Sequence, residues 1–414
     1  MSREKIVLAY SGGLDTSVMV KWLQDERSFE VVTLTVDVGM QKDLVAIEEK
    51  AYALGAVKHY SVDAKSEFVY DYIFPAIRAN ALYEEKYPLS SSIARPLIAS
   101  KLVQIARKED AVAVAHGCTG KGNDQVRFDI TIKTLDPSLK IVAPVREWNM
   151  TRDREVEYAL RHGIPVAKTS NPYSIDQNLW GRSIECGPIE DPSAEPPDDA
   201  FEWTVNATEA PAEPAYVSVG YSEGIPVSLD GKKMDGVALI TALNELAGSH
   251  GVGRIDHIED RLVGIKSHEV YECPAAVCLL DAHKDLEKSV LTRHEVTFKH
   301  LVDIEWARLA YCGLWVDPLR EDLDAFIEAT QSRISGEVKL KLYKGGEIVV
   351  GRSSPYSLYD LSLATYEAWT SFDQKLAPGF IELWGLQTRV ARSIIAKKQK
   401  AVGDMRVQTA ELKS

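Results

Sequence analysis

The sequence predicts an α/β protein built on a parallel, doubly wound sheet, because two sequence periods alternate through the first half of the chain. Short apolar runs, which are typical of strands buried on both faces of a sheet, occur at residues 6–10, 31–36, 57–62, 111–115 and 141–143. Stretches with helical spacing of apolar residues separate these runs, at residues 14–26, 41–54, 64–82 and 93–109. Strands that alternate with helices form a parallel sheet with right-handed crossovers, and such sheets bind ligands beyond the carboxyl ends of their strands.

The second half of the chain follows a different pattern, which predicts an α+β domain and a terminal helix. We expect hairpin-like strands at 216–221 and 337–350, the latter turned by Lys344-Gly-Gly, and helices at 234–248, 279–291 and 300–311. Residues 386–400 place four apolar side chains on one helical stripe beside five basic residues, and these four are Leu386, Val390, Ile394 and Ile395. Such a helix suits packing on its own chain or on a neighbouring subunit. It also suits binding to an anionic surface, but the protein is acidic overall, so we favour packing.

Length, charge and cysteine content exclude several classes of protein. The 414 residues suggest two or three domains, and Lys+Arg 48 against Asp+Glu 61 gives a net charge of −13. This surplus argues against nonspecific binding to nucleic acids or anionic membranes, and no run approaches the ~18 apolar residues of a membrane span. Five cysteines, an odd and small number, point to a reducing compartment. We therefore expect a cytoplasmic protein with no nucleic acid and no membrane as partner.

Residues 188–215 interrupt the pattern of helices and strands. This segment contains eight acids, no Lys or Arg, and six of the chain's 18 prolines. The composition predicts an exposed loop, either a solvated linker or a partner-binding segment. The rest of the chain then carries −13 − (−8) = −5, so most of the net charge belongs to this segment.

A glycine-rich loop follows the first predicted strand and opens the first predicted helix. It reads Ser-Gly-Gly-Leu-Asp-Thr-Ser over residues 11–17. Glycines let the backbone approach a ligand closely, and the first turn of a helix offers unpaired N–H groups to an anion. The loop therefore predicts a phosphate site, although Ser-Gly-Gly alone also suits an ordinary turn. It matches neither Gly-x-x-x-x-Gly-Lys-Ser/Thr nor Gly-x-Gly-x-x-Gly.

A second polar loop follows the fourth predicted strand. Residues 116–128 read His-Gly-Cys-Thr-Gly-Lys-Gly-Asn-Asp-Gln-Val-Arg-Phe. Three glycines, a hydroxyl, two amides, an acid and two cations give this loop more polar binding capacity than a connecting turn needs. We expect it to line a binding site.

These two loops carry a resemblance to known proteins. Ala-Tyr-Ser-Gly-Gly-Leu-Asp-Thr-Ser at 9–17 resembles the pyrophosphate loop of the ATP-pyrophosphatase superfamily, and together with residues 116–128 it resembles the argininosuccinate synthase family. Further stretches similar to this family follow in order at 81–96, 171–183, 251–256, 259–267, 270–275 and 351–359. The resemblance implies a nucleotide-binding domain (1–165), a second α+β synthetase domain (166–375) that contains the acidic loop 188–215, and a C-terminal helical oligomerisation arm with tail (376–414).

The resemblance also implies which residues bind the three substrates. ATP would be bound by Ala9, Tyr10, Ser11, Gly12, Gly13, Leu14, Asp15, Thr16, Ser17, Val36 and Gly117. Citrulline would be bound by Tyr87, Ser92, Asn123, Arg127, Ser174, Ser183, Glu259 and Tyr271, and aspartate by Thr119, Asn123 and Asp124. These types suit the chemistry, since a zwitterion needs a cation, an acid and neutral polar groups for its ureido tail. Taken alone, Arg127 and Glu259 also suit surface ion pairs, and Ser174 and Ser183 suit turns.

The implied reaction consumes ATP and joins citrulline to aspartate. The ureido oxygen of citrulline would attack the α-phosphorus to give a citrulline adenylate and pyrophosphate, and the amine of aspartate would then displace AMP. Asp15 would cap the helix or engage a metal, Lys121 would assist at the phosphates, and Asp124 would orient or deprotonate the aspartate amine. Mg²⁺ would accompany ATP and pyrophosphate, with no metal site built from protein residues alone. The resemblance further implies a homotetramer formed through the C-terminal helix.

Two alternatives stay open at this point: another pyrophosphate-loop enzyme that amidates its substrate or modifies tRNA, and a nucleotide-binding regulator without catalysis. Two residues depart from the family pattern. Cys118 stands where the family has a small residue, and Val36 stands where a small residue of the family contacts the adenine or ribose.

His268, Cys273, Cys278 and His283 recur every five residues. This spacing puts them on no common helix or strand face, so we do not expect a zinc site.

Overall fold

The structure, a computed structural model, describes residues 3–39, 43–148, 152–166 and 172–411. The chain forms two compact units, Met1–Leu358 and Tyr359–Ser414. The predicted α/β class, with a parallel sheet, additional α+β structure and C-terminal helices, is confirmed. The domain boundaries at 165 and 375 stay predictions.

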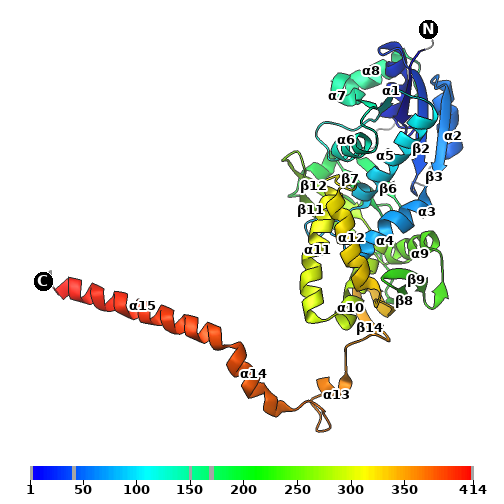
Figure 1. The fold of residues 1–414 in the computed structure, drawn as a ribbon. Helices are drawn as coiled ribbons and strands as arrows, with labels where there is room; N and C mark the ends of the chain where they lie inside the picture. The colour runs from blue at the N-terminus through cyan, green and yellow to red at the C-terminus, as the bar shows by residue number, and fades with distance from the viewer. Residues whose placement is uncertain (1–2, 40–42, 149–151, 167–171, 412–414) are drawn as a thin grey trace. The chain divides into compact units, whose positions relative to one another are not determined.

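The first sheet consists of five parallel strands in the order β3-β2-β1-β4-β5 (Figure 1). Its strands are β1 (Lys5–Ala9), β2 (Glu30–Asp37), β3 (Lys58–Asp63), β4 (Ala113–Ala115) and β5 (Lys140–Val142), and each lies within a residue or two of a predicted strand. Strand β1 is paired with β2 on one side and β4 on the other. The strand order therefore reverses at β1, and the loops after β1 and β4 diverge to leave a crevice at the carboxyl ends.

Helices cover both faces of this sheet because side chains along β1 alternate in direction. Ile6 and Leu8 belong to the hydrophobic cluster that contains Trp22, whereas Val7 belongs to the one that contains Leu102. The helices of this part are α1 (Leu14–Asp25), α2 (Leu44–Ala53), α5 (Ser90–Lys108), α6 (Asp124–Leu135), α7 (Pro144–Trp148) and α8 (Arg152–Arg161). The predicted helix at 64–82 is a helical run of three pieces: α3 (Lys65–Phe68), a π-helical turn (Val69–Ile73) and α4 (Phe74–Arg78). Residues 41–42 of the predicted second helix lie outside the described residues.

Two antiparallel sheets follow. One has the order β11-β12-β7-β6, and its strands are β6 (Ser174–Asn178), β7 (Gly181–Glu185), β11 (Arg254–Asp260) and β12 (Lys266–Glu272). The other has the order β10-β9-β8-β13-β14, and its strands are β8 (Ala215–Ser222), β9 (Ile225–Leu229), β10 (Lys232–Lys233), β13 (Gly336–Tyr343) and β14 (Gly346–Ser353). The predicted hairpin around Lys344 is thus confirmed. The four strands of the first of these sheets were not predicted, because their residues are mostly polar.

Four helices pack with these sheets: α9 (Gly236–Ser249), α10 (Pro274–Val290), α11 (Arg293–Tyr311) and α12 (Pro318–Gln331). Three of them match predicted helices, although α10 begins five residues before the prediction and α11 seven. The second unit contains α13 (Leu361–Ala364), α14 (Ala377–Trp384) and α15 (Leu386–Glu411), the last over the predicted terminal helix. Among the described residues, no helix is long and apolar enough to cross a membrane.

The acidic segment 188–215 differs in part from the exposed loop that its composition predicts. Many of its side chains are exposed, but Ile189, Ala200 and Thr204 are buried. The fully buried carboxylate of Glu272 at the end of β12 accepts backbone N–H bonds at 2.8–3.1 Å, and its donors are Glu202, Trp203 and Thr204. Arg182 pairs with the same carboxylate at 2.8 Å. The segment is therefore anchored on the antiparallel sheet by one buried acid.

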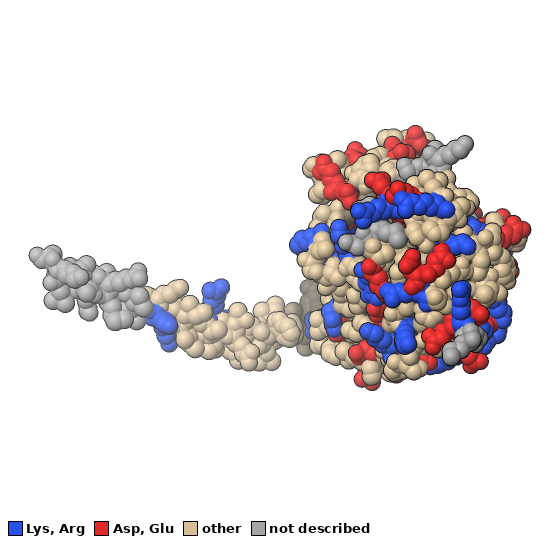
Figure 2. All heavy atoms as spheres, turned by 90° about the horizontal axis from the view of Figure 1, so that it is seen from above, with Lys and Arg blue, Asp and Glu red and all other residues tan. Residues whose placement is uncertain are grey.

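The net charge of −13 does not form one acidic surface. Figure 2 shows Lys and Arg side chains interspersed with Asp and Glu over one face of the molecule. Among the described residues, many charged side chains form ion pairs, for example Arg27 with Glu147 and Arg333 with Glu295. Such exposed pairs contribute little stability each, about 0–1 kcal/mol.

Candidate active site

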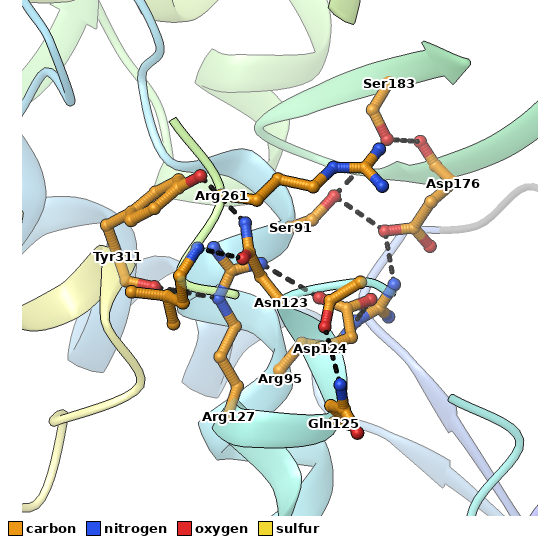
Figure 3. Close-up of polar contacts among 12 residues, drawn as sticks. Ser91, Arg95, Asn123, Asp124, Gln125, Arg127, Asp176, Ser183, Arg261 and Tyr311 are labelled. Atoms are coloured by element: carbon orange, nitrogen blue, oxygen red, sulfur yellow. Dashed lines mark hydrogen bonds and ion pairs between the residues drawn. The ribbon is translucent and has the colours of Figure 1, made fainter. Parts of the chain in front are cut away.

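The loops after β1 and β4 meet at a cavity of about 500 Å³. Residues of the β1–α1 loop line one wall, and residues 116–119 and 122–124 line the next. The β6–β7 and β11–β12 hairpins supply the remaining polar wall (Figure 3). The cavity thus lies at the carboxyl ends of the strands, as predicted, and it lies where the strand order reverses.

The loop after β1 presents the start of helix α1 to this cavity. Gly12 has φ +73°, a left-handed conformation that favours glycine. Gly13 precedes the first helical residue and gives it no side-chain cap, so the N–H groups of the first turn stay available to a ligand. The hydroxyl of Ser17 donates to the Gly13 carbonyl at 2.6 Å and fixes the loop against the helix. This arrangement suits an anion.

A carboxylate shared by two guanidinium groups lines the cavity (Figure 3). Asp124, the first residue of α6, accepts from Arg95 Nε at 2.7 Å and from Arg127 Nη1 at 2.9 Å. Arg95 also donates to Asp176 of β6 at 2.7 Å, so it connects α5 and α6 to the hairpin. Burial opposes ionisation of Asp124, but the two guanidinium groups outweigh burial and hold the pKa of its carboxyl below its ordinary value.

Arg127 is buried yet incompletely paired. Its Nε donates to the carbonyl of Tyr311 at 3.1 Å, and its guanidinium lies 4.9 Å from the centre of the Tyr311 ring. Its Nη2 atom is buried and has no hydrogen-bond partner among the described residues. Because a buried donor without a partner is costly, this atom marks the place of an acceptor supplied by a ligand.

The acid opposite Arg127 is Glu259 of β11, which is also buried. It accepts hydrogen bonds from the hydroxyls of Tyr271, at 2.5 Å, and Tyr311. Tyr87 stacks on Tyr271 with ring centres 4.3 Å apart, so aromatic side chains hold this acid in place. Burial raises the pKa of the Glu259 carboxyl, against the opposing effect of the two hydroxyls.

A third charged group lines the rim of the same cavity. Arg261 donates to both Glu185 and Glu269 at 2.6 Å, so one cation is shared by two acids. Burial, followed by repulsion from Glu269, raises the pKa of Glu185 to about 7, while Arg261 acts in the opposite direction. This carboxyl therefore takes up a proton near neutral pH.

Most of the residues singled out from the sequence lie around this one cavity. Those that line it are Ala9, Tyr10, Ser11, Gly13, Leu14, Asp15, Thr16, Val36, Tyr87, Gly117, Thr119, Asn123, Asp124, Arg127, Ser174, Ser183, Glu259 and Tyr271. Gly12, Ser17, Ser92 and Lys121 lie beside the lining rather than in it, and Lys121 is exposed. Their roles in binding and catalysis stay predictions.

Several lining residues carry no role in the sequence analysis. They are Leu34, Thr35, Ser91, Arg95, Ile98, His116, Cys118, Gly122, Phe128, Ile175, Asp176, Glu185, Arg261 and Glu269. One signal was available, because Ser91 and Arg95 are four residues apart on a single face of α5. The others depend on the antiparallel hairpins, whose placement no local pattern reveals.

Comparison with known proteins agrees with this fold. The sheet of residues 5–165 matches the family model described as the arginosuccinate synthase N-terminal HUP domain, so this part is a nucleotide-binding domain of the HUP class. Residues 173–391 match the arginosuccinate synthase C-terminal domain. The chain therefore belongs to the argininosuccinate synthase family.

Individual relatives match over nearly their whole length. The chain is 59% identical over 391 residues to the argininosuccinate synthase of Pyrococcus furiosus, which covers 94% of this chain and 95% of the relative. It is 56% identical over 395 residues to that of Oceanobacillus iheyensis, with 95% of each chain covered. It is 55% identical over 402 residues to that of Geobacillus kaustophilus, with 97% and 98% covered.

The raised pKa of Glu185 predicts a pH-dependent effect of Glu185→Gln on stability. The folded carboxyl titrates near 7 and the ordinary value is 4.5, so the folded state binds the extra proton between these values and the wild type loses stability as pH rises through this window. The variant lacks this loss. Its unfolding midpoint should therefore rise relative to wild type from pH 5 to pH 8, measured by thermal denaturation.

The control is Glu190→Gln, which changes an exposed acid five residues away. It should show no such trend with pH. A stability difference for Glu185→Gln that stays constant from pH 5 to pH 8 would contradict the assigned titration.

Proposed function

We propose that this chain condenses citrulline with aspartate in an ATP-dependent reaction. The reaction passes through a citrulline adenylate and gives argininosuccinate, AMP and pyrophosphate. The observation that carries the proposal is that one cavity joins the open first turn of α1 to a buried Arg127 with an unpaired donor and a buried Glu259. Phosphates fit the helix start, and a zwitterionic amino acid fits the opposed cation and acid.

ATP binds along the crevice between β1 and β4. The N–H groups of residues 11–17 hold the β and γ phosphates, Gly117 lies beside the loop, and Val36 with Leu34 offers an apolar wall to the nucleoside. Amides fixed before the reaction stabilise pyrophosphate as it leaves, since they need no rearrangement as charge develops there. Lys121 is exposed on the neighbouring turn and approaches the phosphates as an assisting cation.

Mg²⁺ enters with ATP, and the carboxylate of Asp15 suits that mode of binding. Among the described residues, no group of three or more His, Cys, Asp or Glu is arranged to hold a metal ion. Mg²⁺ is commonly held by substrate phosphates and one or two carboxylates, and Asp15 lines the cavity at the first turn of α1. When bound, Mg²⁺ neutralises charge on the phosphates.

Citrulline binds between Arg127 and Glu259. Its carboxylate accepts from the unpaired Nη2 of Arg127, and its ammonium lies against Glu259. The hydroxyls and amide near these two hold the ureido tail, and they belong to Tyr87, Ser92, Asn123, Ser174, Ser183 and Tyr271. The ureido oxygen is thus directed toward the α-phosphorus, and positioning of this kind supplies much of the rate enhancement.

Aspartate binds at the loop after β4, between Thr119, Asn123 and Asp124. Asp124 is held by two guanidinium groups and its pKa is lowered, so it is a weak base. We therefore assign it the orienting role: its carboxylate positions the amine of aspartate for attack on the adenylate. Another pyrophosphate-loop activity is not favoured, because both domain families match over their extent.

The proposal is tested by the dependence of AMP release on the two amino acids. AMP and pyrophosphate should form from ATP only with citrulline present, and AMP should be released at the full rate only when aspartate is also present. Both products are measured by chromatography. AMP release without citrulline, or with ammonia in place of aspartate, would contradict the proposal, and a regulator without catalysis would release no AMP at all.

Asp124→Asn separates the two half-reactions. The amide keeps the size of the side chain but loses the charge that holds the aspartate amine, so argininosuccinate formation should slow by about 100-fold. Citrulline-dependent pyrophosphate formation in a single turnover should fall much less, because the amide oxygen of Asn can still accept from Arg127. Equal loss of both steps would refute the orienting role. The control is Asp136→Asn, which changes an acid at the other end of α6 and outside the cavity. This variant should match the wild type in both steps.

We propose further that the chain assembles as a homotetramer through its C-terminal unit and works in the cytoplasm. Within the second unit, α14 exposes Phe380, Ile381 and Leu383, and the stripe of α15 is 45–60% exposed at Leu386, Val390, Ile394 and Ile395. Apolar patches of this kind mark an interface, here with further copies of the same chain.

The five cysteines of the chain are free thiols, which suits a reducing compartment such as the cytoplasm.

Removal of residues 386–414 should lower the assembly below a tetramer, because it deletes the exposed stripe. The mass in solution is measured by light scattering. Val390→Asp with Ile394→Asp should act like the deletion, whereas Arg392→Asp, on the opposite side of α15, should not. A tetramer that persists after the deletion would refute the assignment.

A further inference from the structure

Lys50 of α2 lies against the glycine-rich loop from outside the cavity, and neither sequence reasoning nor family membership gives it a role here. Its ammonium donates to the carbonyl of Gly12 at 2.7 Å, across 38 residues of sequence. The side chain is half-buried, and among the described residues no ion pair joins it to a carboxylate. Burial lowers the pKa of Lys50. A partly desolvated cation with one neutral partner is a costly arrangement that calls for a reason.

Helix α2 contacts Gly12 at a second point. A Cβ atom built on Gly12 would lie 3.0 Å from Cγ1 of Ile47, which is one turn before Lys50 on the same helix. Asp43 caps the helix by accepting from the N–H groups of Val45 and Ala46, so its first turn is fixed. Gly12 is therefore held between a close apolar contact and a hydrogen bond.

The direction of the Gly12 carbonyl decides the direction of the next N–H group. In a trans peptide the C=O of one residue and the N–H of the next point to opposite sides. Lys50 holds the Gly12 carbonyl away from the cavity, whose lining includes Gly13 but not Gly12. The N–H of Gly13 points instead toward the hydroxyl of Ser11, a lining residue, at 3.4 Å.

We infer that Lys50 is a positioning residue for the phosphates of ATP: it fixes the Gly12–Gly13 peptide with its N–H toward the cavity, and its charge lies behind the loop that receives the phosphates. The inference rests on the proposed use of ATP. A peptide fixed in advance spares the reorganisation that an oppositely oriented peptide would require when phosphates bind. The effect is confined to ligands that reach the loop, so AMP, which lacks the β and γ phosphates, serves as the internal reference.

The test compares Lys50→Met with Lys50→Arg in the full chain. Titration calorimetry measures binding of ATP, inorganic pyrophosphate and AMP without citrulline or aspartate. Lys50→Met should weaken ATP and pyrophosphate by about tenfold and leave AMP within about twofold of wild type. Lys50→Arg, which keeps a donor and the charge, should restore most of the ATP affinity. Lys21→Met, on α1 and without a loop contact, should bind all three like the wild type.

Two results would overturn the inference. One is unchanged ATP affinity in Lys50→Met, and the other is equal weakening of ATP and AMP, which would indicate general damage to the fold. A thermal melt of each variant identifies such damage independently. Since these binding measurements do not involve the amino-acid substrates, failure of the proposed condensation in the wild type remains distinguishable from failure of the role assigned to Lys50.

Discussion

The site depends on the carboxylate of Asp124, which two arginines share. It stands at the start of α6 directly after the loop from β4, and Arg95 and Arg127 approach it from α5 and from the next turn of α6. Arg95 reaches on to Asp176 in β6. This chain of charges joins the parallel sheet to the antiparallel hairpins. Without the Asp124 carboxylate, the guanidinium groups of Arg95 and Arg127 would lose the anion that they share. Because both groups are largely buried, their mutual repulsion would then be costly.

This arrangement also explains how an acidic protein accepts anionic substrates. The net charge of the chain is −13, yet the cavity offers the amides of the α1 start and three arginines, Arg95, Arg127 and Arg261. Local fields govern binding at a site, and the total charge governs solubility and long-range steering. Each arginine is paired with acids inside the cavity, and only Arg127 keeps a buried donor without a partner. This atom is therefore the donor of the three guanidinium groups that still needs an acceptor.

The parts of the site that the sequence predicts are those that local rules determine. Glycines next to a strand and a helix start are adjacent in the chain, so residues 9–17 and 116–128 were recognisable before the structure was known. The hairpins that carry Ser183, Glu259 and Tyr271 were not, because strands such as Ser174–Asn178 are short and polar. Their residues could be named only through the family resemblance. Tyr311 shows the limit most clearly: it ends a long helix and meets Glu259 from 52 residues away.

The composition of the acidic segment predicts an exposed loop throughout, and this is only partly correct. Three of its backbone N–H groups donate to the buried carboxylate of Glu272, and a count of prolines and acids gives no sign of these bonds. Glu272 adjoins Tyr271 in β12, and Arg182 adjoins Ser183 in the facing strand. The segment is therefore free to vary in length over 191–195, where its side chains are exposed. At 202–204 one inserted residue would shift the donors away from the carboxylate and strain the strand that presents Tyr271. The two ends of this loop therefore differ in what an insertion would disturb: exposed side chains alone at 191–195, and the hydrogen bonds to Glu272 at 202–204.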